Sequence, residues 1–149
     1  MIQSFISKFT NEKIESVQIE RNFFFVPDDL KPLVSKIKPF SAGLFLGEMK
    51  GKDFMPSIAL LDWISERSGK KIFLNKKASW LFLCGRDVFG EGILRGKASK
   101  NELVLVQNEL DENLGYGKVI DDLSKKNKVV IKTILDKGYF LRKERKEGK

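Results

Sequence analysis

The side chains of this sequence that could do chemistry are mainly cationic. The chain has 28 Lys and Arg residues against 20 Asp and Glu residues, a net charge of +8 at pH 7. Because lysine and arginine pair with phosphates, this excess favours a polyanion as the partner. Three basic groups stand out in the second half of the chain: Lys76 and Lys77; Arg86, Arg95 and Lys97; and Lys132, Lys137, Arg142 and Lys143.

The residues that most often carry catalysis are scarce. The sequence has no histidine and a single cysteine, Cys84. These counts exclude a Ser-His-Asp triad, a Cys-His pair, an internal disulfide and a zinc site built from His and Cys. A carboxylate or lysine mechanism stays open, but the usual general base near neutral pH is missing. We therefore predict that the protein is not an enzyme and that it needs no metal or other cofactor.

The positive charge is confined to one part of the chain. Residues 1–68 contain nine basic and nine acidic residues, whereas residues 69–149 contain 19 basic and 11 acidic residues. A thermophilic or generally lysine-rich surface would spread the excess over both parts. A basic domain beside a neutral one is typical of nucleic-acid-binding proteins. The sequence thus predicts two domains, 1–68 and 69–149.

Hydrophobic patterning indicates a small α/β domain over residues 1–68. The expected elements are a strand at 23–26, a helix at 30–37, a strand at 42–49 and a helix at 58–64. Asp28 and Asp29 are expected to cap the first helix, with Pro32 in its first turn, and Ser57 to cap the second. This phenylalanine-rich domain would supply a core and a surface for docking a protein.

Residues 69–149 are predicted to form a β-rich domain. A strand at 71–74 leads into a short apolar helix at 78–84. Short strands separated by turn residues follow, at 88–94, 103–106, 114–120, 129–134 and 139–141. This spacing favours a small closed or nearly closed barrel over a parallel sheet. The charged residues from Arg142 onward are expected to form a frayed basic tail.

Four segments of the second half resemble the motifs of a known module. They are the segments at 72–78, 84–93, 113–119 and 136–143, which read IFLNKKA, CGRDVFGEGI, NLGYGKV and DKGYFLRK. Together and in this order they resemble the PUA domain, which is named after pseudouridine synthases and archaeosine transglycosylases. The resemblance implies an α+β protein, with an N-terminal α/β domain followed by a PUA-type β-barrel that carries a short helix.

The first half extends the resemblance. Residues 23–26, 43–47 and 58–64 occur in the order found in one PUA-containing family of eukaryotes and archaea. Its members are small factors required for pre-rRNA processing and large ribosomal subunit assembly, and they have no catalytic domain. The similarity covers roughly residues 20–145, although the N-terminal region is shorter and the tail more basic than usual. It implies binding to precursor ribosomal RNA, with ribosome-assembly or RNA-processing proteins as further partners.

The resemblance also implies where RNA would lie. In PUA domains nucleic acid generally follows the short helix, the next strand and the last strand, so the three basic groups would converge on one face. Lys76 and Lys77 open the helix, whose free N–H groups attract phosphate. Trp80 is a candidate for stacking on an unpaired base, although on so apolar a helix packing in a core or between domains is the commoner role.

Three further features have structural explanations. The G-x-G-x-x-x-G segment at 90–96 is one residue too long for a dinucleotide-binding loop, and its glycines are expected to relieve crowding in a bent strand. The Asp28-Asp29 and Asp121-Asp122 pairs are expected to cap helices and not to bind metal. Cys84 is expected to be a small buried side chain.

The sequence thus predicts an RNA-binding protein and leaves two alternatives open. One is a protein–protein adaptor in which the first domain does the main work. The other, and the least favoured, is an RNA-modifying enzyme, because PUA domains often accompany catalytic domains. No run of about 18 apolar residues occurs and the N-terminus does not resemble a signal peptide, so we expect a cytoplasmic protein without membrane contact.

Overall fold

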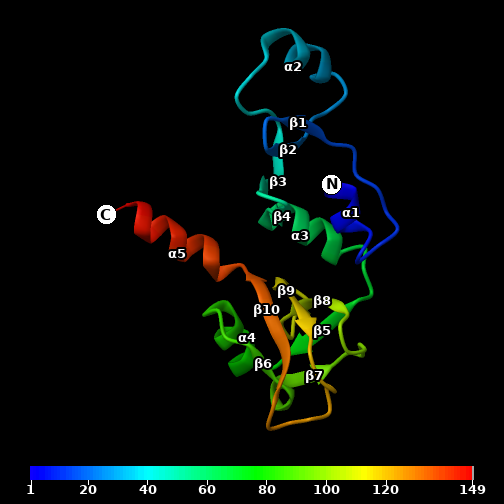
Figure 1. The fold of residues 1–149 in the computed structure, drawn as a ribbon, viewed down its shortest axis with the longest axis vertical. Helices are drawn as coiled ribbons and strands as arrows, with labels where there is room; N and C mark the ends of the chain where they lie inside the picture. The colour runs from blue at the N-terminus through cyan, green and yellow to red at the C-terminus, as the bar shows by residue number, and fades with distance from the viewer. Residues whose placement is uncertain (149) are drawn as a thin grey trace. The chain divides into compact units, whose positions relative to one another are not determined.

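The computed structural model describes residues 1–148, which form two compact units. The first unit is Met1–Arg67, and the second begins at Ser68. Figure 1 shows the first unit in blue to green and the second in green to red. No helix among the described residues is long and apolar enough to cross a membrane.

The first unit is built around a four-stranded antiparallel sheet. Its strands follow the chain in the order β1-β2-β3-β4. The elements are α1 (Ile2–Ile6), β1 (Val17–Ile19), β2 (Asn22–Phe25), α2 (Lys31–Ile37), β3 (Leu44–Lys50), β4 (Asp53–Pro56) and α3 (Ile58–Ser65). Sequential neighbours pair throughout, so local patterning was sufficient to locate the strands β2 and β3.

The two helix starts predicted in this unit have different outcomes. Ser57 caps α3 as predicted, because its hydroxyl accepts a hydrogen bond from the Leu60 N–H at 3.1 Å. The prediction for Asp28 and Asp29 is wrong: Leu30 precedes α2, and no side chain caps it. Pro32 does lie in the first turn of α2. The apolar side chains of α2 are not buried, so their helical spacing does not mark a core face.

The second unit contains a six-stranded sheet in the order β6-β10-β9-β8-β5-β7. Its pairs are antiparallel except for β5 with β8. The elements are β5 (Lys71–Leu74), α4 (Lys76–Leu83), β6 (Val88–Phe89), the 3₁₀ turn η1 (Gly90–Gly92), β7 (Ile93–Arg95), β8 (Leu103–Gln107), β9 (Asn113–Val119), β10 (Val129–Asp136) and α5 (Gly138–Glu147).

The predicted single strand at 88–94 is two strands at opposite edges of this sheet. β6 pairs with β10 and β7 pairs with β5, yet only η1 separates β6 from β7 along the chain. The sheet must therefore curl until its two edges approach each other, which makes it a half-barrel. η1 fits this bend because a Cβ on Gly90 would lie 2.4 Å from the main-chain oxygen of Lys125. The glycines relieve crowding, as predicted.

The core of the half-barrel combines side chains from the strands with Phe82 of α4. Its buried members are Ile72, Leu74, Phe82, Val88, Val104, Val106, Leu114, Val119, Val130 and Ile131. Burying side chains of this size removes enough apolar surface from water to stabilise the curled sheet. The predicted strands at 103–106, 114–120 and 129–134 correspond to β8, β9 and β10, which supply most of this core.

The end of the chain differs from the prediction. Residues 139–141 are not a strand but lie in α5, which continues through Glu147, so the prediction of a frayed tail is also wrong over the described part of that segment. The Asp136 carboxylate accepts a hydrogen bond from the Tyr139 N–H at 2.9 Å, where β10 gives way to α5 (Figure 1). Lys149 lies outside the described residues.

Candidate nucleic-acid interface

Two lysines stand directly opposite each other on neighbouring strands of the half-barrel. Lys132 of β10 is paired in register with Lys118 of β9, and both side chains are exposed. Neither ammonium group has an ion-pair or hydrogen-bond partner within residues 1–148. Like charges at directly opposed positions destabilise a sheet. A bound anion between or above the two lysines would relieve this repulsion.

Arg86 is held beside this lysine pair. The Thr133 N–H, next to Lys132, donates to the Asp87 carboxylate at 2.9 Å, and the Thr133 hydroxyl donates to the carbonyl of Arg86 at 2.9 Å. These bonds fix the loop after α4 against β10. The structure therefore holds the main chain of Arg86 against β10 next to Lys132, both of which were predicted, and pairs Lys132 with Lys118, which was not.

Helix α4 presents its first turn and one aromatic side chain to solvent. Asn75 caps the helix by accepting from the Ala78 N–H at 2.8 Å, and the Lys76 N–H donates to the Glu109 carboxylate at 3.0 Å. These two N–H groups are thus not free for a phosphate, although the ammonium groups of Lys76 and Lys77 are exposed.

The outer side of α4 is less buried than its apolar sequence predicts. The Trp80 side chain is 66% exposed, so it is not a core residue and its ring is open to stacking. Cys84 is exposed as well, and the prediction that it is buried is wrong. Gly85 follows with a φ of +85°, the left-handed conformation that ends many helices.

Arg142 has a structural role. Its guanidinium contacts both oxygens of the buried Asp136 carboxylate, at 3.0 and 3.1 Å, and donates to the Leu83 carbonyl at 2.6 Å. It therefore joins α5 to the end of α4. Of the other cations predicted near the end of the chain, Lys137 is half-buried and Lys143 lies 3.7 Å from Glu147.

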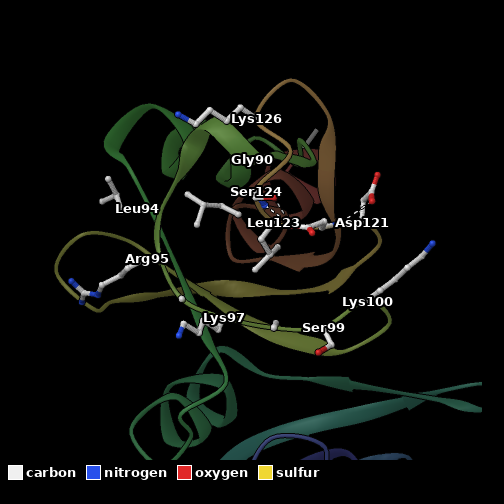
Figure 2. Close-up of a pocket in the computed structure, with 14 residues that line it drawn as sticks. Gly90, Leu94, Arg95, Lys97, Ser99, Lys100, Asp121, Leu123, Ser124 and Lys126 are labelled. Atoms are coloured by element: carbon white, nitrogen blue, oxygen red, sulfur yellow. Dashed lines mark hydrogen bonds between the residues drawn. The ribbon is translucent and has the colours of Figure 1, made fainter.

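Arg95 and Lys97 lie in a different place, a hollow of about 830 Å³ between the β7–β8 loop and the β9–β10 loop. Lys100 and Lys126, which were not predicted, also line it. Figure 2 shows Arg95, Lys100 and Lys126 around the hollow with their charged ends turned outward, and Leu123 and Ser124 nearer its middle. The predicted group of Arg86, Arg95 and Lys97 is thus split: the Arg86 main chain lies against β10 near Lys132, whereas Arg95 and Lys97 lie at this hollow.

Asp121 and Asp122 line the same hollow and do not cap a helix, so that prediction is wrong. The hydrogen bond from Lys125 lowers the pKa of Asp121 below its ordinary value. Hydrogen bonds from the Ser124 hydroxyl and N–H lower the pKa of Asp122 in the same way. Both are therefore carboxylates at neutral pH. Within the described residues no group of three or more His, Cys, Asp or Glu could hold a metal ion.

The missed cations carry weak sequence signals. Lys118 follows Gly117 within the predicted strand at 114–120, where strand alternation alone does not mark which lysine will meet another. Lys100 and Lys126 lie in loops among several lysines. Lys118 is placed opposite Lys132 by the strand register, and Lys100 and Lys126 are brought to the hollow by the curl of the sheet. Both the register and the curl depend on contacts between residues that are distant in sequence.

The comparisons with known proteins agree on one family. The sequence model described as UPF0113 PUA domain matches residues 70–145. Two UPF0113 proteins, from Archaeoglobus fulgidus and Aeropyrum pernix, are each 30% identical to this chain, over 119 and 127 residues. The matches cover 76% and 83% of this chain and 68% and 70% of those proteins.

Solved structures share the fold at lower identity. A conserved PUA domain protein from Thermoplasma acidophilum has a TM-score of 0.63 and 18% identity, covering 96% of this chain and 91% of that one. A hypothetical protein from Pyrococcus horikoshii has a TM-score of 0.55 and 13% identity, covering 91% and 89%. The curled sheet, the matched residues and the archaeal relatives together show that this chain belongs to the UPF0113 family and that its second unit is the family's PUA domain.

Proposed function

We propose that this protein binds RNA through its second unit and acts by recognition, without catalysis. The observation that carries the proposal is the exposed, unpaired Lys118–Lys132 juxtaposition on the PUA sheet, with Arg86 held beside it. Two adjacent unpaired cations, with a third basic residue held on the neighbouring loop, would attract the closely spaced phosphates of a nucleic acid strand. PUA domains are generally RNA-binding, which fits this surface.

The charge distribution supports the same unit as the binding element. Residues 69–149 contain all of the chain's net positive charge, and most of their lysines are exposed. Phosphate contacts would set the affinity, while main-chain groups and the exposed Trp80 ring would favour unpaired or structured elements over a regular duplex.

Precursor ribosomal RNA is the RNA class we propose, with a role in large-subunit assembly or rRNA processing. The support is the resemblance of residues 20–145 to factors of that kind, in which an α/β domain precedes a PUA domain. RNA cross-linked to a tagged copy of the protein in archaeal cells should be enriched in large-subunit rRNA precursors. Enrichment of transfer RNA alone would contradict this assignment.

The RNA-binding proposal is tested by fluorescence anisotropy of labelled single-stranded and hairpin RNA with the intact protein across a salt series. We expect a log–log salt slope of about 0.7 per phosphate contact on single strands. The variant carrying Lys118→Glu and Lys132→Glu should bind much more weakly. A control with the same charge change, Lys36→Glu with Lys52→Glu in the first unit, should retain most of the affinity. Equal losses in both variants would contradict the proposed surface.

A protein adaptor is the second candidate function, and helix α2 favours it. Its Leu33 and Ile37 side chains are 50% and 62% exposed, and Phe40 just after it is 85% exposed. Clustered apolar side chains in solvent are typical of protein-docking surfaces. If this function dominates, a partner protein should be captured by the intact chain and lost on Ile37→Glu, while the RNA affinity of the wild-type chain stays close to that of an unrelated basic protein.

A further inference from the structure

The first unit has a cavity of its own, the edge groove, which the proposed RNA binding does not use. The groove has a volume of about 540 Å³ and lies between strand β1 and the C-terminal part of α2 with the residues that follow it. Figure 1 shows α2 and β1 next to each other in this unit. The apolar lining of the groove comes from both sides, and its members are Val17, Ile19, Val34, Pro39 and Phe40.

The side of β1 that faces the groove has main-chain groups without a partner strand. β1 is an edge of the four-stranded sheet. The Met49 N–H of β3 donates to the Arg21 carbonyl at 2.8 Å, so the main chain of the next residue, Asn22, is directed toward β1. Asn22 lies opposite Ile19, and hydrogen-bonding directions alternate along an antiparallel strand. The N–H and C=O of Gln18 therefore point to the free edge, where a strand from another molecule could pair with them.

The opposite wall of the groove offers apolar contacts and cannot itself pair with β1 at Pro39, which has no N–H. Phe40 is 85% exposed and Val34 is half-buried. Apolar side chains of this size gain about 1.5–3 kcal/mol each when a partner covers them fully. A groove with unpaired main-chain groups on one side and apolar side chains on the other suits an extended peptide segment.

The charges at the groove indicate the chemistry of that segment. Lys38 lines the groove and Lys36 stands two residues before it. Both are exposed, and neither ammonium group has an ion-pair or hydrogen-bond partner among residues 1–148. Lys31, at the start of α2, is by contrast already paired with two carboxylates. Glu20, at the turn after β1, is the acidic residue that lines the groove. The two free lysines on the α2 side therefore favour a partner that brings carboxylates to them.

We propose that the edge groove binds an extended, acidic segment of another protein. The segment pairs with the Gln18 main chain as an added strand, places an apolar side chain between β1 and α2, and directs carboxylates to Lys36 and Lys38. The inference goes beyond RNA binding by the second unit. It also gives the adaptor function a partner of defined chemistry.

Charge and composition argue against two other occupants. A symmetric dimer uses the same surface patch on both copies. Contact through this groove would therefore bring the free Lys36 and Lys38 of one copy toward those of the other, and like charges repel. RNA presents phosphates and not apolar side chains on its outside, so an apolar groove does not match it.

The test titrates fluorescein-labelled synthetic peptides with the intact protein and follows their anisotropy. The parent peptide has a run of isoleucines flanked by glutamates. Three relatives replace the glutamates by lysines, replace the isoleucines by serines, or carry methyl groups on the main-chain nitrogens of the isoleucines. The parent should bind about fivefold more tightly than the lysine-flanked peptide, as expected for a few exposed ion pairs. The serine and methylated peptides should bind at least as poorly as the lysine-flanked one.

Two variants of the protein sharpen the test. Lys36→Glu with Lys38→Glu should reverse the preference, so that the lysine-flanked peptide binds more tightly than the parent. The matched control, Lys13→Glu with Lys52→Glu, makes the same charge change at exposed lysines outside the groove and should keep the wild-type preference. Gln18→Pro removes the outward N–H, which an edge strand tolerates, and should abolish binding of the parent peptide. Thermal unfolding checks that each variant is folded.

The outcomes decide for or against the edge groove without deciding RNA binding. Binding of none of the peptides, equal binding of the parent and methylated peptides, or a preference unchanged by the reversal of Lys36 and Lys38 would overturn the inference. Wild-type protein that forms dimers which Gln18→Pro dissolves would overturn it as well, because a second copy would then be the occupant. RNA titrations of Gln18→Pro should match those of the wild type, so either result leaves the RNA-binding function to its own test.

Discussion

Lys118 and Lys132 oppose each other in register across strands β9 and β10, and neither has a counter-charge within residues 1–148. The pairing joins the second and third strands of the six-stranded order and therefore does not involve an edge strand. The repulsion between two lysines at this distance lowers the stability of the free protein. Because the pair does not help the fold, its effect on RNA binding can be tested separately from its effect on stability.

Lys132→Glu should have opposite effects on stability and on binding. It replaces a like-charge pair by an ion pair, which is worth about 0.2–1 kcal/mol across a sheet. Urea unfolding should therefore show a small gain in stability, while anisotropy shows weaker RNA binding. Lys52→Glu, in an exposed turn of the first unit, is the control for a simple change of net charge. A loss of stability together with unchanged RNA affinity would count against the functional reading of the pair.

Removing Arg142 should destabilise the protein more than removing its neighbour Lys143. Arg142→Ala leaves the buried Asp136 carboxylate without its ion pair and the Leu83 carbonyl without its donor. Loss of charged hydrogen bonds of this kind costs about 2 kcal/mol, reduced here because the guanidinium is partly exposed. Chemical denaturation gives the comparison, and equal stability of the Arg142→Ala and Lys143→Ala variants would contradict the structural role of Arg142.

Trp80 should report RNA binding by fluorescence. Its ring is open to solvent, whereas Trp63 is covered by the Arg67 guanidinium at 4.4 Å from the ring centre. Stacking on a base should quench the Trp80 emission, so titration with single-stranded RNA is expected to lower the fluorescence of the wild type. Trp80→Phe should abolish the quenching and weaken binding modestly. Quenching that persists in the variant would assign the signal to Trp63.

The Lys71–Asp111 ion pair predicts a pH-dependent contribution to stability. Its hydrogen bond, 2.9 Å long, lowers the pKa of Asp111 below the ordinary value. Because the carboxyl is more acidic in the folded than in the unfolded state, the pair stabilises the fold above about pH 4 and loses its contribution as the pH falls through the folded pKa. Lys71→Met should therefore be less stable than wild type at pH 7, with the difference narrowing in acid. A difference that stays constant down to pH 2 would show that Lys71 acts through packing alone.

Much of the fold could be predicted from the sequence where local signals decide it. Ser57 is a residue type favoured at helix N-caps and stands directly before an apolar run with helical spacing, and the apolar runs of β8 and β10 admitted few other structures. The strand β5 and helix α4 were likewise predicted from two apolar runs on either side of Asn75, the residue that caps α4.

Other features depend on contacts that no local pattern encodes. An apolar triplet such as Tyr139–Leu141 fits a strand or a helix equally, and the hydrogen bonds of Asp136 to the Tyr139 N–H and Arg142 decide for the helix. Trp80 and the apolar side chains of α2 are exposed, although their apolar sequences favour burial. Whether a helix face is buried depends on which other elements pack against it, and the helix's own sequence does not encode this. For the candidate site, composition located the basic unit, whereas the pairing of Lys118 with Lys132 required the register.

The most direct test of RNA binding by the second unit is ultraviolet cross-linking of the intact protein to single-stranded RNA, with the cross-linked residues mapped by mass spectrometry. We expect cross-links in the second unit, at Trp80 and in the segments that carry Arg86, Lys118 and Lys132, with a further set in the loops around Lys97 and Lys126. Cross-links confined to residues 1–67, or spread evenly over both units, would contradict the central claim.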